Sequence, residues 1–147
     1  MIDISQLRET PTVYCYTPKG DTVTFKAIKR EINKVAKAYG VPVAFAFDEI
    51  VFETCGNIVV EDCLVVYNPK HANDYYKIVF RIRRDGDIAY ISKSEYGISK
   101  RMNCAYAFWS DDKDASSVSI NGIYDEEFHT EKNYYQALKV IFKFLKC

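Results

Sequence analysis

A chain of 147 residues has the length of one ordinary domain, and its 48% hydrophobic and 27% charged residues are typical of a globular protein rather than a disordered one. Its 20 basic and 20 acidic residues cancel to a net charge of zero, which disfavours a general polyanion-binding protein. No apolar run reaches the roughly 20 residues that a membrane-spanning helix needs, and the first ten residues lack the basic and apolar regions of a signal peptide, so we expect a cytoplasmic protein without membrane association.

The first part of the chain predicts a strand and then an amphipathic helix. Residues 12–17 are rich in strand-forming side chains and are followed by a turn signal at Pro18 to Asp21. Thr24 is placed as the N-cap of a helix over residues 25–39, and Gly40 as its left-handed C-terminal cap. Helical spacing gives this helix one apolar face: Phe25, Ile28, Ile32, Val35 and Tyr39.

Four strands are predicted next, near residues 43–53, 58–67, 75–84 and 87–93. Asp85-Gly86 is a strong tight-turn signal, and a two-residue turn there pairs Arg84 with Asp87 and Phe80 with Ile91. Side chains alternate between the faces of a strand, so this hairpin separates into two faces. The core face holds Ile78, Phe80, Ile82, Ala89 and Ile91. The open face holds Lys77, Val79, Arg81, Arg83, Ile88 and Tyr90.

The last part of the chain predicts a strand near residues 104–109, a second tight hairpin within 117–124 and a C-terminal amphipathic helix near 131–146. Strands that follow one another through tight turns favour an antiparallel sheet. The sequence therefore predicts a single α+β domain over residues 1–147, with a largely antiparallel sheet and two helices.

The zero net charge conceals an alternation of charged segments. Residues 19–40 carry +4, residues 41–74 carry −5, residues 75–104 carry +4, residues 105–131 carry −6 and residues 132–147 carry +4. Such segregation can give a domain basic and acidic surfaces that orient a partner, although the segments can equally neutralise one another within the fold.

The five cysteines and two histidines give no recognisable metal or disulfide pattern. The cysteine count is odd and no C-x-x-C pair occurs, so we expect reduced thiols, with Cys15, Cys63 and Cys104 in the core and Cys147 exposed. His71 and His129 have no partner at metal-ligand spacing, and Asp111, Asp112 and Asp114 do not continue into a calcium-binding loop. We expect no metal and no cofactor.

Two carboxylate pairs leave one catalytic alternative open. Asp48-Glu49 and Glu61-Asp62 lie on strands expected to be adjacent, and one member of each pair can meet across the sheet. Such a cluster beside basic strands is compatible with a metal-dependent nuclease. The plainer reading is that these acids pair with the basic hairpin. No phosphate-binding glycine loop and no nucleophile motif is present, which favours a non-enzymatic protein.

The sequence thus predicts a small interaction protein that binds a larger protein or a protein–nucleic acid complex, in an accessory or inhibitory role such as those of phage or mobile-element proteins. Charge of both signs and twelve tyrosines favour a protein partner, with direct nucleic-acid binding as the alternative. The predicted contact residues are Lys77, Arg81, Arg83 and Tyr90 on the hairpin, and Lys29, Arg30, Lys34 and Lys37 on the first helix.

Overall fold

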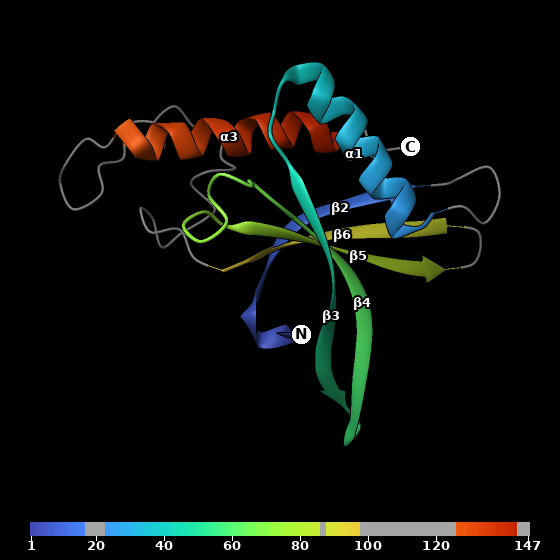
Figure 1. Ribbon diagram of the computed structural model, residues 1–147. Coiled ribbons are helices and arrows are strands. Elements are labelled where there is room, and N and C mark those ends of the chain that lie inside the picture. Colours follow the sequence, from blue (N-terminus) through green and yellow to red (C-terminus); the bar gives the residue numbers. More distant parts are fainter. Residues whose placement is uncertain (17–22, 86–87, 98–125, 144–147) are drawn as a thin grey trace.

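The computed structural model describes residues 1–16, 23–85, 88–97 and 126–143 (Figure 1). Within them, six strands form one sheet in the order β1-β3-β4-β5-β6-β2, and two α-helices are present. All neighbouring strands are antiparallel except β1 and β3, which confirms the predicted α+β domain. The elements are β1 (Ile2–Asp3), the 3-10 helix η1 (Ile4–Gln6), β2 (Leu7–Tyr16), α1 (Phe25–Tyr39), β3 (Ala44–Thr54), β4 (Asn57–Tyr67), β5 (Lys77–Asp85), β6 (Ile88–Tyr96) and α3 (Glu126–Phe142).

The first helix confirms its prediction from end to end. The Thr24 hydroxyl accepts a hydrogen bond from the backbone N–H of Ala27, and Gly40 adopts the left-handed conformation at a φ of 70°. The inward face differs at one position. Tyr39 is 59% exposed, and Ala36 is buried in the core instead.

Two elements begin earlier than predicted. β2 starts at Leu7 and passes through Pro11, which is tolerated because β2 is an edge strand whose pairing with β6 is irregular between Glu9 and Val13. α3 starts at Glu126 rather than at residue 131. The predicted strand at 104–109 and the predicted hairpin at 117–124 lie outside the described residues.

The sheet is strongly curled. β1 and β2 occupy its two opposite edges, yet η1 joins them with three residues. Three residues span at most about 11 Å, so the two edges must approach each other at this corner. The Asp3 side chain accepts from the Ser5 backbone N–H, and Gln6 Oε1 accepts from the Asp3 backbone N–H, which fixes the connection.

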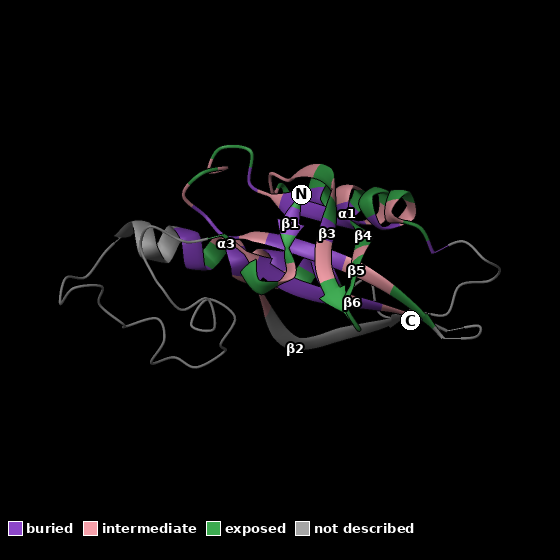
Figure 2. Cartoon of the chain, turned by 90° about the horizontal axis from the view of Figure 1, so that it is seen from below, coloured by how far each residue is buried: buried purple, intermediate pink, exposed green. Residues whose placement is uncertain are grey.

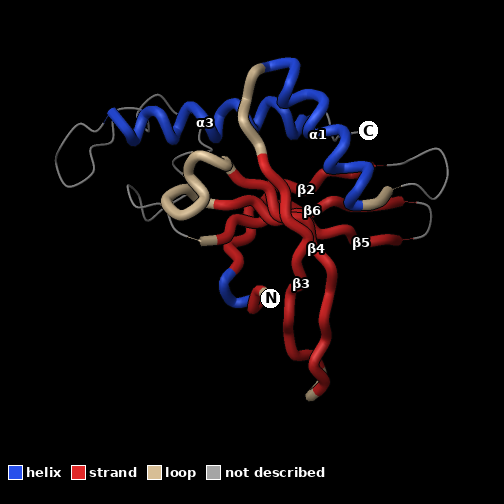
Figure 3. The backbone as a smooth tube through the Cα atoms, viewed as in Figure 1, coloured by secondary structure: helices blue, strands red, loops and turns tan. Residues whose placement is uncertain are grey.

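The curled sheet has a core on each face. Both helices cover the outer face (Figures 1 and 3), where the larger core includes Leu64, Phe80 and Phe142. A smaller core on the opposite face holds Ile2, Ile50, Cys63, Val65 and Val79. Buried residues accordingly concentrate on the central strands, while α1 and the end of the β3–β4 hairpin carry exposed ones (Figure 2). No described helix has the length and apolarity required to cross a membrane.

The β5–β6 hairpin corrects the predicted register while keeping the predicted core face. Asp85 pairs with Ile88, Arg84 with Ala89 and Phe80 with Lys93, so the turn lies one residue later than predicted and the register shifts by two. A shift of two leaves every side chain on the same face because the strand period is two. Ile78, Phe80, Ala89 and Ile91 are therefore buried beneath the helices as predicted. The other face is not open throughout, because Val79 is fully buried in the smaller core.

Removing the Phe80 side chain should strongly destabilise the fold. Phe80 is fully buried and meets Phe142 of α3 edge-to-face, with ring centroids 5.0 Å apart. We expect Phe80→Ala to lower the free energy of unfolding by about 3–5 kcal/mol in a urea titration, because a cavity remains. The matched control is Phe47→Ala, since Phe47 is 55% exposed and its loss should cost less than about 1 kcal/mol. Equal costs for the two variants would contradict the assigned core.

Candidate functional site: a basic helix beside an acidic ribbon

The outer side of α1 carries an uncompensated group of cations. We call this surface the α1 basic face; it consists of Lys26, Lys29, Arg30, Lys34 and Lys37, all exposed. Helical spacing groups them because burial of Ile28, Ile32 and Val35 turns the opposite arc of the helix outward. Among the described residues, no carboxylate lies within ion-pair distance of any of them. The structure therefore brings together the predicted contact residues Lys29, Arg30, Lys34 and Lys37.

Two phenylalanines of β3 lie next to this face. The Lys29 ammonium is 5.7 Å from the centroid of the Phe45 ring and 5.6 Å from that of Phe47. A cation over an aromatic face is attracted by the negative potential of the ring. Phe47 remains 55% exposed despite this contact. An exposed aromatic side chain beside cations gives the basic surface an apolar anchor point.

The β3–β4 hairpin continues from this point as a long two-stranded ribbon (Figure 3). Its backbone closes through Cys55 and Gly56, both with positive φ, as a tight two-residue turn. β4 pairs with β5 only at residues 64–66 in the described part of the chain. The outer half of the ribbon, residues 57–63 of β4 with their partners on β3, therefore has no neighbouring strand on the β4 side. On the helix-side face of that half, Glu49 lies opposite Asp62 and Val51 opposite Val60.

The helix-side face of the ribbon carries both acidic and apolar side chains. Glu49 and Asp62 are exposed, as are Val60 and, at 77%, Ile58. A cavity of about 400 Å³ separates the start of α1 from the ribbon, and Phe25, Phe47, Glu49 and Asp62 are among the residues that line it. The basic face of α1 thus borders an acidic ribbon, with Phe47 between them.

The predicted contact residues of the hairpin lie on the other side of the sheet. Lys77, Arg81, Arg83 and Tyr90 share the face turned away from the helices. Arg81 forms two hydrogen bonds with the Glu61 carboxylate, at 2.8 and 3.2 Å, and the Lys77 ammonium lies 5.4 Å from the centroid of the Tyr67 ring. Arg83 is exposed and lies opposite Tyr90. The eight predicted residues therefore form two separate surfaces.

The four strand carboxylates do not converge on one point. Glu49 and Asp62 meet across the ribbon as expected, but Asp48 and Glu61 point to the opposite face. The N-terminal ammonium, 2.9 Å from Asp48 Oδ1, and the backbone N–H of Glu49 hold the pKa of Asp48 below its usual range. Within the described part of the chain, no group of three or more His, Cys, Asp and Glu side chains is placed to hold a metal ion.

Two cysteines can be assigned. Cys63 is buried as predicted, and burial together with the charge of Asp48 raises the pKa of its thiol to about 11. A thiol with a raised pKa is a poor nucleophile at neutral pH. Cys55 is exposed at the ribbon turn, and both thiols are free.

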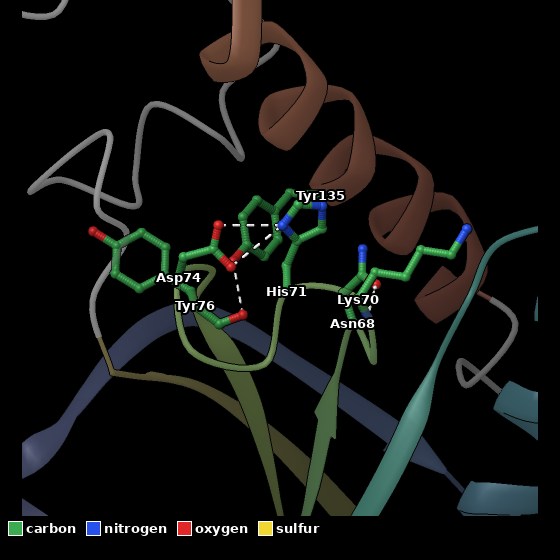
Figure 4. Close-up of polar contacts among 6 residues, drawn as sticks. All are labelled: Asn68, Lys70, His71, Asp74, Tyr76 and Tyr135. Atoms are coloured by element: carbon green, nitrogen blue, oxygen red, sulfur yellow. Dashed lines mark hydrogen bonds and ion pairs between the residues drawn. The ribbon is translucent and has the colours of Figure 1, made fainter.

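His71 helps to hold the loop between β4 and β5 (Figure 4). Its Nδ1 lies 3.2 Å from Asp74 Oδ2, and its ring stacks on Tyr75 with centroids 4.0 Å apart. The buried Tyr135 hydroxyl donates a 2.7 Å hydrogen bond to the Tyr76 carbonyl and so ties this loop to α3. These contacts give His71 a structural role at this position.

A buried charged layer beneath α3 was missed by the sequence reasoning. Lys93 and Glu95 of β6 are each 3% exposed, and Glu131 of α3 is fully buried. The missed signal is the two-residue period of β6. Every second residue, Ala89, Ile91, Lys93 and Glu95, faces the helices, and β6 extends beyond its predicted end at residue 93, so both charges lie under the helices. Burial lowers the pKa of Lys93 to about 8, with Glu95 opposing and Lys139 reinforcing the shift.

Comparison with protein-family models, with curated proteins and with solved structures finds no match for this chain. The assignment of a function therefore rests on the surfaces described above.

The lowered pKa of Lys93 predicts a distinct pH dependence of stability. Between pH 8 and about 10.5, the usual pKa of lysine, the unfolded chain holds a proton on Lys93 that the folded protein has released. The contribution of Lys93 to the free energy of unfolding should therefore rise with pH in this window, by an amount on the order of a few kcal/mol.

Comparing wild type with Lys93→Met by urea titration from pH 7 to 10 isolates this contribution from other titrating groups. Wild type should gain stability relative to the variant as the pH rises. Lys34→Met, at an exposed position of α1, should show no such trend. A difference between wild type and Lys93→Met that stays constant with pH would show that Lys93 titrates normally.

Proposed function

We propose that this protein is a small non-enzymatic binding protein that docks onto an acidic surface of a larger protein through the α1 basic face. The observation that carries the proposal is the exposed set of five cations with no described carboxylate partner, next to the exposed ring of Phe47. A protein that holds a partner without reacting with it acts as an accessory or an inhibitor, and this is the role that we propose.

The neighbouring ribbon favours a protein partner over a nucleic acid. Glu49 and Asp62 lie at the border of the basic surface, and a polyanion lying along α1 meets their repulsion. A protein partner can instead match both signs of charge. Exposed Phe47, Val60 and Ile58 add the apolar contacts that carry most of the binding energy at protein interfaces.

The cations on the sheet face opposite to the helices are a weaker candidate for the contact surface than those of α1. Arg81 is already paired with Glu61, and breaking that pair to bind a partner carries a cost. Lys77 is held against Tyr67. Arg83 is left as the exposed cation of that set in the described residues.

Charge reversal on α1 should weaken binding of the partner. We expect Lys29→Glu combined with Lys34→Glu to weaken binding by more than about tenfold, because like charges then face each other across the interface. The measurement is affinity capture of the full chain from the native host lysate after nuclease treatment, followed by a titration with the purified captured protein. The matched control, Lys70→Glu with Arg83→Glu, changes the net charge equally at exposed positions away from α1.

The control separates the alternatives. Unchanged affinity in the α1 variant, with loss in the control, would move the interface to the sheet face. Capture of nucleic acid in place of a protein, with an affinity that falls steeply with salt, would instead support direct nucleic-acid binding.

Phe47 should act as an anchor rather than as a structural residue. Phe47→Ala should weaken partner binding by about tenfold or more, as expected for a central aromatic contact, while leaving the urea unfolding midpoint nearly unchanged. Phe52→Ala, at a half-buried position of the same strand that packs against the smaller core, should show the reverse pattern. Full affinity in Phe47→Ala would remove this side chain from the interface.

A further inference from the structure

A second cavity lies at the end of the sheet where β2 and β5 begin and β6 ends. Its volume is about 440 Å³, within the range of small-molecule sites. It shares no residue with the α1 basic face. The lining residues come from three separate parts of the chain: Gln6, Arg8, Ala72, Asn73, Tyr75, Lys77, Tyr96 and Gly97.

The charges that line this cavity are both positive. Arg8 and Lys77 line it, and no Asp or Glu does. The Lys77 ammonium lies 5.4 Å from the Tyr67 ring, a contact that leaves its charge unneutralised, and no described carboxylate lies within ion-pair distance of it. Among the described residues, Arg8 forms an ion pair with the buried Glu95, whose Oε2 lies 4.0 Å from Nε of Arg8, a distance longer than a hydrogen bond. The cavity therefore has an excess of positive charge.

The Arg8 side chain is held in place by an aromatic ring and a backbone carbonyl. Its guanidinium lies 4.4 Å from the centroid of the Tyr76 ring, and one terminal nitrogen donates to the Gly97 carbonyl. A guanidinium has five N–H donors in a fixed arrangement, and the Arg8 side chain is still 41% exposed. Donors thus remain for an oxyanion, and phosphate suits the planar arrangement of these donors.

The rest of the cavity lining consists of aromatic and amide side chains. Tyr96 is half-buried and lines the cavity beside the amide side chains of Gln6 and Asn73. Tyr75 also borders the cavity but is only 4% exposed, and its ring stacks on His71. The loop that carries Asn73 is held by the stacking of His71 on Tyr75. The His71–Asp74 contact and the hydrogen bond from Tyr135 to Tyr76, both drawn in Figure 4, hold it further. A preformed wall lowers the entropic cost of binding a small ligand.

We propose that this cavity binds a small organic phosphate in which a phosphate monoester lies close to a planar ring. Arg8 and Lys77 bind the phosphate, and Tyr96 contacts the ring. A nucleotide and an aryl phosphate share this chemistry. This proposal is independent of the partner that α1 binds.

Calorimetric titration of the full chain tests the site with 5′-AMP, phenyl phosphate, adenosine and inorganic phosphate. We expect saturable binding of 5′-AMP or phenyl phosphate, with adenosine and inorganic phosphate each at least about tenfold weaker, because each lacks one of the two contacts. Lys77→Gln should weaken binding of the phosphate by about tenfold or more. Lys70→Gln, on the same loop connection but outside the cavity lining, should bind like wild type.

The location is checked by amide NMR shifts, which should move at Ala72, Asn73 and Gly97 on titration. The proposal is overturned if neither ring-bearing phosphate binds, or if adenosine or inorganic phosphate binds as tightly. It is equally overturned if Lys77→Gln and Lys70→Gln bind alike. A denaturation curve for each variant confirms that it is folded. We expect Lys77→Gln to fold, because Lys77 is only half-buried.

Discussion

Burial of one face of the curled sheet beneath α1 and α3 is the constraint on which the rest of the structure depends. The apolar face of α1 and the inward side chains of α3 are buried in one core with residues such as Leu64 and Phe80. A helix with one buried arc must present its polar arc to solvent. The position of the α1 basic face is therefore a consequence of core packing, and the surface it creates is available to a partner.

Alternation of side chains along β5 explains why the predicted contact residues form two separate surfaces. Strand alternation places Lys77 and Arg81 on the face opposite to the helices, and the smaller core around Val79 occupies part of that face. Glu61 then neutralises Arg81. The alternating charge segments of the sequence consequently behave differently: the basic segment on α1 stays exposed, whereas much of the basic segment on β5 is used within the fold.

Local signals in the sequence were enough for much of the fold. Thr24 and Gly40 defined α1, and period-two alternation identified the buried face of the β5–β6 hairpin. The two-residue register shift was beyond sequence reasoning, because Asp85-Gly86 and Gly86-Asp87 are both acceptable turns. The pairing of Arg81 with Glu61 agrees with the expectation that strand acids pair with the basic hairpin. The cavity between Arg8, Lys77 and Tyr96 was not predicted, because it depends on tertiary contacts across long chain separations that no local pattern encodes.

The central claim is that the α1 basic face is the contact surface for a protein partner. Its most direct test is amine-reactive footprinting of the lysines, with and without the captured and purified partner. The account predicts protection of Lys29, Lys34 and Lys37, with unchanged reactivity at Lys70. Unchanged reactivity of the three α1 lysines in a saturated complex would contradict it.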